Sequence, residues 1–318
     1  MQIPLGGSGV LEILKFEGVL HVRHCATQQL ETSDDKTNKK FMPYKPFHLI
    51  LWCFLLCSIV EYIEFLFIKT DQTMLAENVI CKLFAMALIV VVLWTRREKI
   101  SCLGFVKKGI ARSAALGLSL GVSTFAISYG VEYVVLTLMG SQPKIQFYIS
   151  NFALSNQNVT GTSPAVIVIC ILGNVLNVLA EEGLFRGLFL HLGKEEFSVK
   201  KSNAIQAALF GVWHIVMVVV WVMEGSMDVP SAVLMAAGYV LLAGILGYEW
   251  GLCVALTGTI WAGVFEHFFN NFITNSLHMA TASGVDEMQI LRIVLSNVLS
   301  LTFVILIARK RKNAGEAI

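Results

Sequence analysis

Charged residues are scarce in this chain. Only 14% of its 318 residues are Asp, Glu, Lys or Arg, and 56% are hydrophobic, whereas a typical soluble domain carries about 25% charged residues. The formal net charge is only +2, which is too small to indicate a nucleic acid partner. The composition therefore favours an integral membrane protein that contacts the lipid bilayer and binds no nucleic acid.

Several signals of other protein classes are missing as well. The seven cysteines are scattered, mostly inside apolar runs, and form no CxxC pair, which argues against a disulfide framework and a cysteine zinc site. A charged segment followed by an apolar segment and a cleavage site is absent from the start, so we expect no signal peptide. No HExxH or GxGD motif occurs. We interpret residues 1–45 as a mobile cytoplasmic segment.

Long apolar runs follow this segment. A transmembrane helix needs about 20 apolar residues, and eight segments meet this requirement: 48–68, 77–95, 114–139, 164–190, 203–223, 230–249, 253–274 and 289–308. The sequence therefore predicts an all-α polytopic membrane bundle of about eight transmembrane helices. Residues 249–252 are expected to form a short loop. Glu61 and Glu64 are expected at the membrane interface.

The basic residues predict the orientation of the bundle. They gather before the first span, in the loops 96–112 and 194–201, and in the tail 309–312. The alternate loops contribute only Lys69, Lys82 and Lys144 to this count. Because basic loops favour the cytoplasmic side, we expect a cell-membrane protein with both termini in the cytoplasm.

Polar residues interrupt the fourth span in the sequence "AEEGLFRG". A charged group at mid-membrane costs about 2.5–3.5 kcal/mol on the insertion scale, so these residues should face the interior. Glu182 and Arg186 are four residues apart and can pair on one helix face. Glu181 lies about 100° round the helix and heads a polar stripe with Asn177 and Asn174. The alternative is that both glutamates share Arg186.

Two further spans carry a histidine on a polar face. In "FGVWH" the side chains of Phe210 and His214 share a face, and in "HFFNN" His267 and Asn271 do so. Each motif alone is compatible with a hydrogen-bonded packing residue or an interfacial cap. Together with Glu181, they predict a water-activating site. The carboxylate would accept a proton from water, and an imidazole and an amide would stabilise an oxyanion.

The three motifs, in this order and separation, resemble the CPBP family of intramembrane proteases, which includes the CAAX prenyl endopeptidases and abortive-infection-like proteins. The resemblance covers about residues 160–275. It implies that Glu181 is the general base, that His214 binds the water, and that His267 and Asn271 form the oxyanion hole. The supporting residues it implies are Glu182, Arg186 and Phe210.

The resemblance also implies a division of the chain and a chemistry. Residues 46–160 would be accessory helices, 161–275 the catalytic core, and 276–318 the last helix with a basic tail. The expected activity is that of a hydrolase, a protease of the CAAX-processing type that cuts a peptide or membrane-protein substrate.

Three alternatives remain open from the sequence. Glu181, His214 and His267 could bind zinc, as in a metalloprotease, or act without a metal. The chain could also be a non-catalytic immunity or scaffold protein of the same fold. A transporter is a more distant alternative, since buried carboxylates and histidines also form proton relays.

Overall fold

A computed structural model describes residues 45–73, 78–150, 161–282, 284 and 286–315 of the chain. The predicted segment 1–45 therefore lies outside the described residues, except for Lys45. Within the described part, seven helical segments are long and apolar enough to cross a membrane. This confirms the predicted all-α polytopic bundle.

The first half of the described chain contains three of these segments. Its elements are α2 (Pro46–Ile63), the π-helix η3 (Glu64–Ile68), the 3₁₀-helix η4 (Thr70–Gln72), α3 (Val79–Arg96), the 3₁₀-helix η5 (Ile100–Leu103), α4 (Ile110–Leu138) and β1 (Lys144–Phe147).

The second half contains the other four, together with one shorter helix. Its elements are α5 (Pro164–Glu181), the π-helix η6 (Glu182–Phe189), α6 (Leu190–Gly193), α7 (Val199–Trp213), α8 (Ile215–Met223), α9 (Val229–Thr257), α10 (Trp261–Ser276), β2 (Leu277–Ala280) and α11 (Gln289–Asn313).

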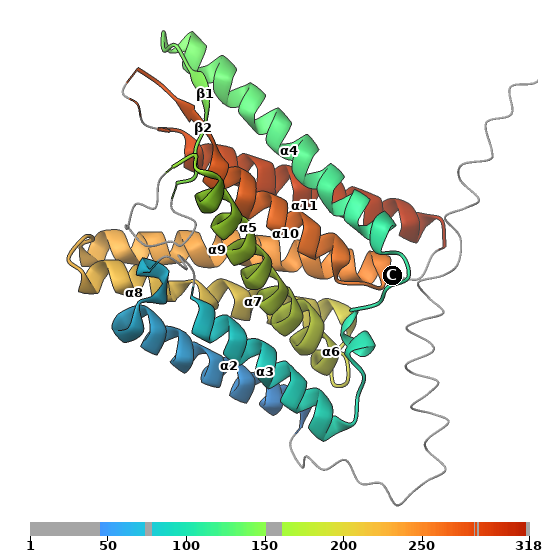
Figure 1. Ribbon diagram of the computed structural model, residues 1–318. Helices are drawn as coiled ribbons and strands as arrows, with labels where there is room; N and C mark the ends of the chain where they lie inside the picture. The colour runs from blue at the N-terminus through green and yellow to red at the C-terminus, as the bar shows by residue number, and fades with distance from the viewer. Residues whose placement is uncertain (1–44, 74–77, 151–160, 283, 285, 316–318) are drawn as a thin grey trace, which may run out of the picture.

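Helix α5 occupies the centre of the bundle (Figure 1). It contacts α3 on one side and α10 on the other, and α10 in turn contacts α4 and α9. Helices α2 and α3 pack against each other, as do α7 and α9. A polar residue on the inner face of α5 is therefore within reach of residues on both α3 and α10.

A two-stranded antiparallel sheet joins two connections at one end of the bundle. Strands β1 and β2 pair from Lys144 with Ala280 to Phe147 with Leu277. The sheet lies near the end of α4 and the start of α5 (Figure 1). Because β2 directly follows α10, the sheet ties the end of α10 to the connection before α5.

The predicted loop at 249–252 is wrong, because α9 runs without a break to Thr257. The polar "YEWG" sequence instead packs inside the bundle. Glu249 is fully buried and accepts a hydrogen bond of 2.5 Å from Ser300. A Cβ at Gly251 would meet Asn203 Oδ1 at 1.7 Å, so the glycine serves a close approach of α7 and α9. The turn comes later, at Gly258, which has a positive φ of 70°.

Glu61 and Glu64 are both buried inside the bundle, with exposed fractions of 3% and 0%, and their position at the membrane interface stays a prediction. The carboxylate of Glu64 accepts hydrogen bonds from the backbone N–H groups of Ile80 at 2.9 Å and Cys81 at 2.6 Å. These donors belong to the first turn of α3, where N–H groups have no partner within the helix. Glu64 therefore caps α3 and fixes its start against α2.

Candidate active site

The two adjacent glutamates lie where the central helix changes its winding. Glu181 is the last residue of α5, and Glu182 begins the π-helix η6 that extends to Phe189. Both carboxylates are buried, with exposed fractions of 5% and 0%. Short π-helical segments are frequent at functional sites, and this one begins directly after Glu181.

The sequence-based pairing of Glu182 with Arg186 is present, with Oε1 and Nη1 3.4 Å apart. The guanidinium also stacks on aromatic rings, since its central carbon lies 3.8 Å from the ring centre of Phe210 and 4.8 Å from that of Trp250. Arg186 is 1% exposed. Phe210 therefore supports the site by covering a buried cation, which is a favourable arrangement in a desolvated setting.

Glu181 has a partner that the sequence interpretation missed. The Nζ atom of Lys82, on α3, lies 2.6 Å from Glu181 Oε1, and both side chains are about 5–6% exposed. The distribution of basic residues groups Lys82 with the loops, although it falls inside the predicted second span. A lysine within an apolar run was the signal that could have identified it, because such a residue needs a partner inside the bundle.

His267 stands between the two glutamates. Its Nδ1 atom lies 3.1 Å from Glu182 Oε1, and its Nε2 atom lies 3.8 Å from Glu181 Oε2. The ring stacks on Trp250, with centroids 4.1 Å apart and an angle of 19° between the planes. A carboxylate only accepts hydrogen bonds, so Nδ1 carries the hydrogen toward Glu182. In the neutral imidazole, Nε2 is then an acceptor directed toward Glu181.

His214 occupies the junction between α7 and α8. Its Nδ1 atom donates to the carbonyl of Phe210 at 2.8 Å, which leaves Nε2 as the acceptor of the neutral ring. The ring of Phe210 contacts both imidazoles edge-on, with centroid distances of 4.7 Å to His214 and 6.2 Å to His267. The structure thus brings both histidines to one aromatic ring beside Glu181.

The asparagines of α10 differ in their surroundings. Asn270 is buried and donates a hydrogen bond of 2.9 Å to Asn297 on α11. Asn271 lies one turn after His267 and is partly exposed. Asn270 therefore has a packing contact, and the oxyanion role of Asn271 stays a prediction.

A possible metal-binding group lies elsewhere in the described part of the chain. Ligand atoms of Glu98, His191 and Glu195 lie within 4.8 Å of one another. Arg96 already contacts both carboxylates of this group, with 2.9 Å between its Nη2 atom and Glu98 Oε1. Burial alone would raise the pKa of Glu98, but the hydrogen bond with His191 and the charges of His191 and Arg96 outweigh it and lower the pKa.

The predicted zinc ligands have suitable chemistry but an unfavourable neighbour. Imidazole nitrogens and a carboxylate are common zinc ligands. However, the ammonium of Lys82 lies against Glu181 Oε1, so a divalent cation bound by Glu181 would face a fixed positive charge at close range. The arrangement of Glu181, His214 and His267 therefore does not fit a zinc site.

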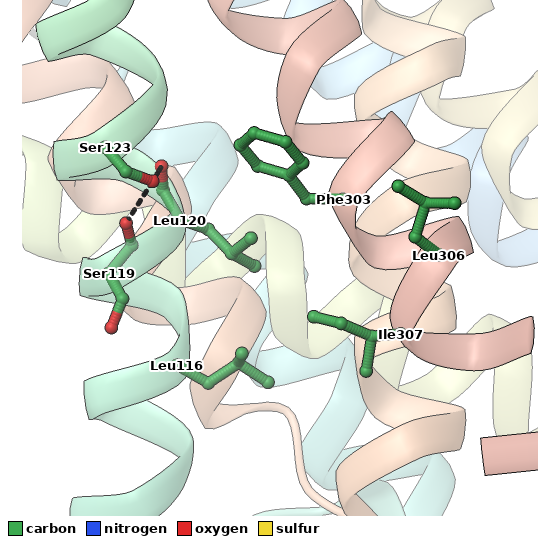
Figure 2. A pocket seen from close by; sticks show the side chains of 7 residues that line it. All are labelled: Leu116, Ser119, Leu120, Ser123, Phe303, Leu306 and Ile307. Atoms are coloured by element: carbon green, nitrogen blue, oxygen red, sulfur yellow. Dashed lines mark hydrogen bonds between the residues drawn. The ribbon is translucent and has the colours of Figure 1, made fainter. Parts of the chain in front are cut away.

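An apolar groove of about 370 Å³ lies between α4 and α11, away from these residues (Figure 2). The hydroxyl of Ser123, which lines it, bonds back to the carbonyl of Ser119 at 2.6 Å. The groove therefore presents an apolar surface, and no residue of the predicted site lines it.

Comparison with known proteins gives one match. A family model described as type II CAAX prenyl endopeptidase Rce1-like matches residues 163–273. The curated proteins and the solved structures give no match. The matched segment runs from the start of α5 into α10 and contains Glu181, His214 and His267. It leaves out Lys82 on α3. The match confirms the resemblance predicted from the three motifs: residues 163–273 are similar to the type II CAAX prenyl endopeptidase Rce1-like family.

Proposed function

We propose that this membrane protein is an intramembrane endopeptidase that hydrolyses a peptide bond of a CAAX-type substrate with Glu181 as the general base. One observation carries the proposal. Glu181 Oε2 and His267 Nε2 face each other at 3.8 Å, while the other oxygen of Glu181 contacts Lys82 and the other ring nitrogen of His267 contacts Glu182. Two proton acceptors are thus fixed toward the same point.

A water molecule at this point is activated in the first step. The separation of 3.8 Å is too long for a direct hydrogen bond and suits a water that contacts both atoms. Glu181 takes a proton from the water, and the oxygen attacks the peptide carbonyl carbon. An unprotonated Nε2 of His267 accepts a hydrogen bond from this water and orients it. This differs from the oxyanion role that the family resemblance implied.

The tetrahedral intermediate then collapses. The amide side chain of Asn271 donates to the oxyanion, which is the kind of interaction that lowers such a barrier most. The C–N bond breaks, and the protonated Glu181 returns its proton to the leaving amine. His214 stabilises the arrangement through its position on the ring of Phe210.

The proposal also includes the orientation of the protein in the membrane. The connections near Arg96, Lys107 and Lys200 are basic, so we infer that both termini face the cytoplasm of a cell-membrane protein. Single cysteines introduced at Lys107 and Lys144 test this in intact cells. A membrane-impermeant thiol reagent added from outside should label the second position alone. Labelling of the first would reverse the orientation.

The activity is tested with purified protein in lipid nanodiscs and a prenylated reporter peptide ending in a CAAX box. Mass spectrometry should detect a shortened peptide with wild-type protein, with or without a chelator, and none with Glu181→Gln. Product lost on chelation and restored by zinc would contradict the metal-free step. The absence of product with wild-type protein would support a non-catalytic scaffold instead.

A further inference from the structure

We propose that Lys82 is a positioning residue for the proposed hydrolysis, supplied by a helix outside the family-matched segment. The inference rests on the proposed function, because it concerns the orientation of the proposed base. By holding Oε1 of Glu181 at 2.6 Å, the ammonium of Lys82 leaves Oε2 directed toward His267. Helix α3 is then part of the active enzyme.

The buried position of Lys82 supports a specific role. Its exposed fraction is 4%, and an isolated ammonium is costly to bury unless it is paired. Besides Glu181, the ammonium lies 5.5 Å from the ring centre of Trp213, the residue that precedes His214. Lys82 therefore contacts residues on both sides of the candidate site, on α5 and on α7.

The surrounding structure fixes Lys82 in turn. Glu64 caps the first turn of α3 through the N–H groups of Ile80 and Cys81, directly before Lys82. Glu61, on the neighbouring helix α2, is buried and interacts electrostatically with both Lys82 and Glu181. The ammonium thus interacts with two carboxylates and lies near an aromatic ring, and the helix that carries it is anchored at its start.

A purely structural ion pair between α3 and α5 is the alternative. It would hold the helices together without setting the direction of Oε2. The two roles differ in their effect on kinetics. Loss of a structural pair lowers the amount of folded enzyme, whereas loss of a positioning contact lowers kcat in the enzyme that remains folded. A small misplacement of a reacting group can cost about 100-fold in rate.

The test compares four variants in nanodiscs on the prenylated CAAX reporter peptide, with kcat and KM determined per folded molecule. Lys82→Met and Lys82→Gln remove the charge, and Lys82→Arg retains it. Lys69→Met is the matched control, because Lys69 forms an ion pair of 3.0 Å with Glu224 at a partly exposed position.

We expect Lys82→Met and Lys82→Gln to lose about 100-fold in kcat with little change in KM, since the effect is on orientation and not on substrate affinity. Lys82→Arg should recover most of the loss, and Lys69→Met should behave as wild type. Lys82→Gln, which keeps most of the side-chain length, covers the case in which Lys82→Met does not fold.

The outcomes separate this inference from the proposed function. Wild-type kcat in Lys82→Gln or Lys82→Met, with Glu181→Gln inactive, would overturn the positioning role alone. Full activity of Glu181→Gln would overturn the proposed function. Wild-type protein that releases no product would overturn both.

Discussion

The ion pair between Lys82 and Glu181 predicts a large energetic coupling. The two side chains are 5% and 6% exposed and 2.6 Å apart, and removing one partner of a buried pair costs about 3–5 kcal/mol. Lys82 retains an electrostatic interaction with Glu61 when Glu181 is neutralised, so we expect about 3 kcal/mol for Glu181→Gln. Lys82→Met leaves two buried carboxylates without the ammonium, and we expect about 5 kcal/mol.

The double variant should lose less than both singles together, because it carries no uncompensated charge from the pair. We expect a loss of about 5 kcal/mol instead of about 8, which is a coupling of about 3 kcal/mol, the upper end for residues in contact. The free energy of unfolding is measured by denaturant titration in mixed micelles, followed by tryptophan fluorescence and helicity.

The surface pair of Lys69 and Glu224 supplies the control cycle. Its side chains are 37% and 34% exposed, and such pairs contribute about 0–1 kcal/mol. A coupling near zero for Lys82 and Glu181, equal to that of the control pair, would refute the inference that the two groups form a buried ion pair.

Two further predictions concern the framework around the site. Gly117→Ala should destabilise the protein, because a Cβ would lie 2.2 Å from the backbone oxygen of Ala262 on α10. Gly130→Ala on the same helix meets nothing within 4 Å and should stabilise the protein by up to about 1 kcal/mol. Unfolding titrations that rank Gly117→Ala as more stable than Gly130→Ala would contradict this. Burial raises the pKa of Glu98, but its interactions with His191 and Arg96 lower it below the ordinary value of 4.5. The interactions of ionised Glu98 with His191 and Arg96 therefore stabilise the folded protein above that pH, and this stabilisation is lost as the pH falls through the lowered pKa. Glu98→Gln should flatten the pH dependence of the free energy of unfolding on the acid side. An unchanged slope would argue against these interactions.

The apolar runs predicted the helices well because hydrophobicity and length alone decide which segments can cross a bilayer. The position of the turn after α9 could not be predicted in this way. Glu249 is buried, and its partner Ser300 lies 51 positions away in the chain. The polarity of Glu249 alone indicated a loop, because the sequence does not show that Ser300 donates a hydrogen bond to it inside the bundle. For the same reason the sequence did not predict the burial of Glu64, whose partners lie on α3.

In the candidate site, contacts within one helix could be predicted from the sequence, whereas contacts between helices could not. The spacing of Glu182 and Arg186 predicted their contact because both residues lie on one helical segment. The contact of Glu181 with Lys82 joins residues 99 positions apart, and helical periodicity carries no information on such pairs. The contact of His267 with Glu182 likewise joins residues 85 positions apart, so it could not be predicted from helical spacing.

The most direct test of the account is the single-turnover rate of peptide cleavage by Glu181→Gln compared with Glu182→Gln, each measured on protein with wild-type helicity. General acid–base catalysis contributes about 10²–10⁴-fold, so the account predicts that Glu181→Gln loses at least about 100-fold. Glu182→Gln should keep measurable cleavage, because the amide oxygen can still accept from His267 Nδ1. Equal rates in wild type and Glu181→Gln, or a complete loss confined to Glu182→Gln, would contradict the assignment of Glu181 as the base.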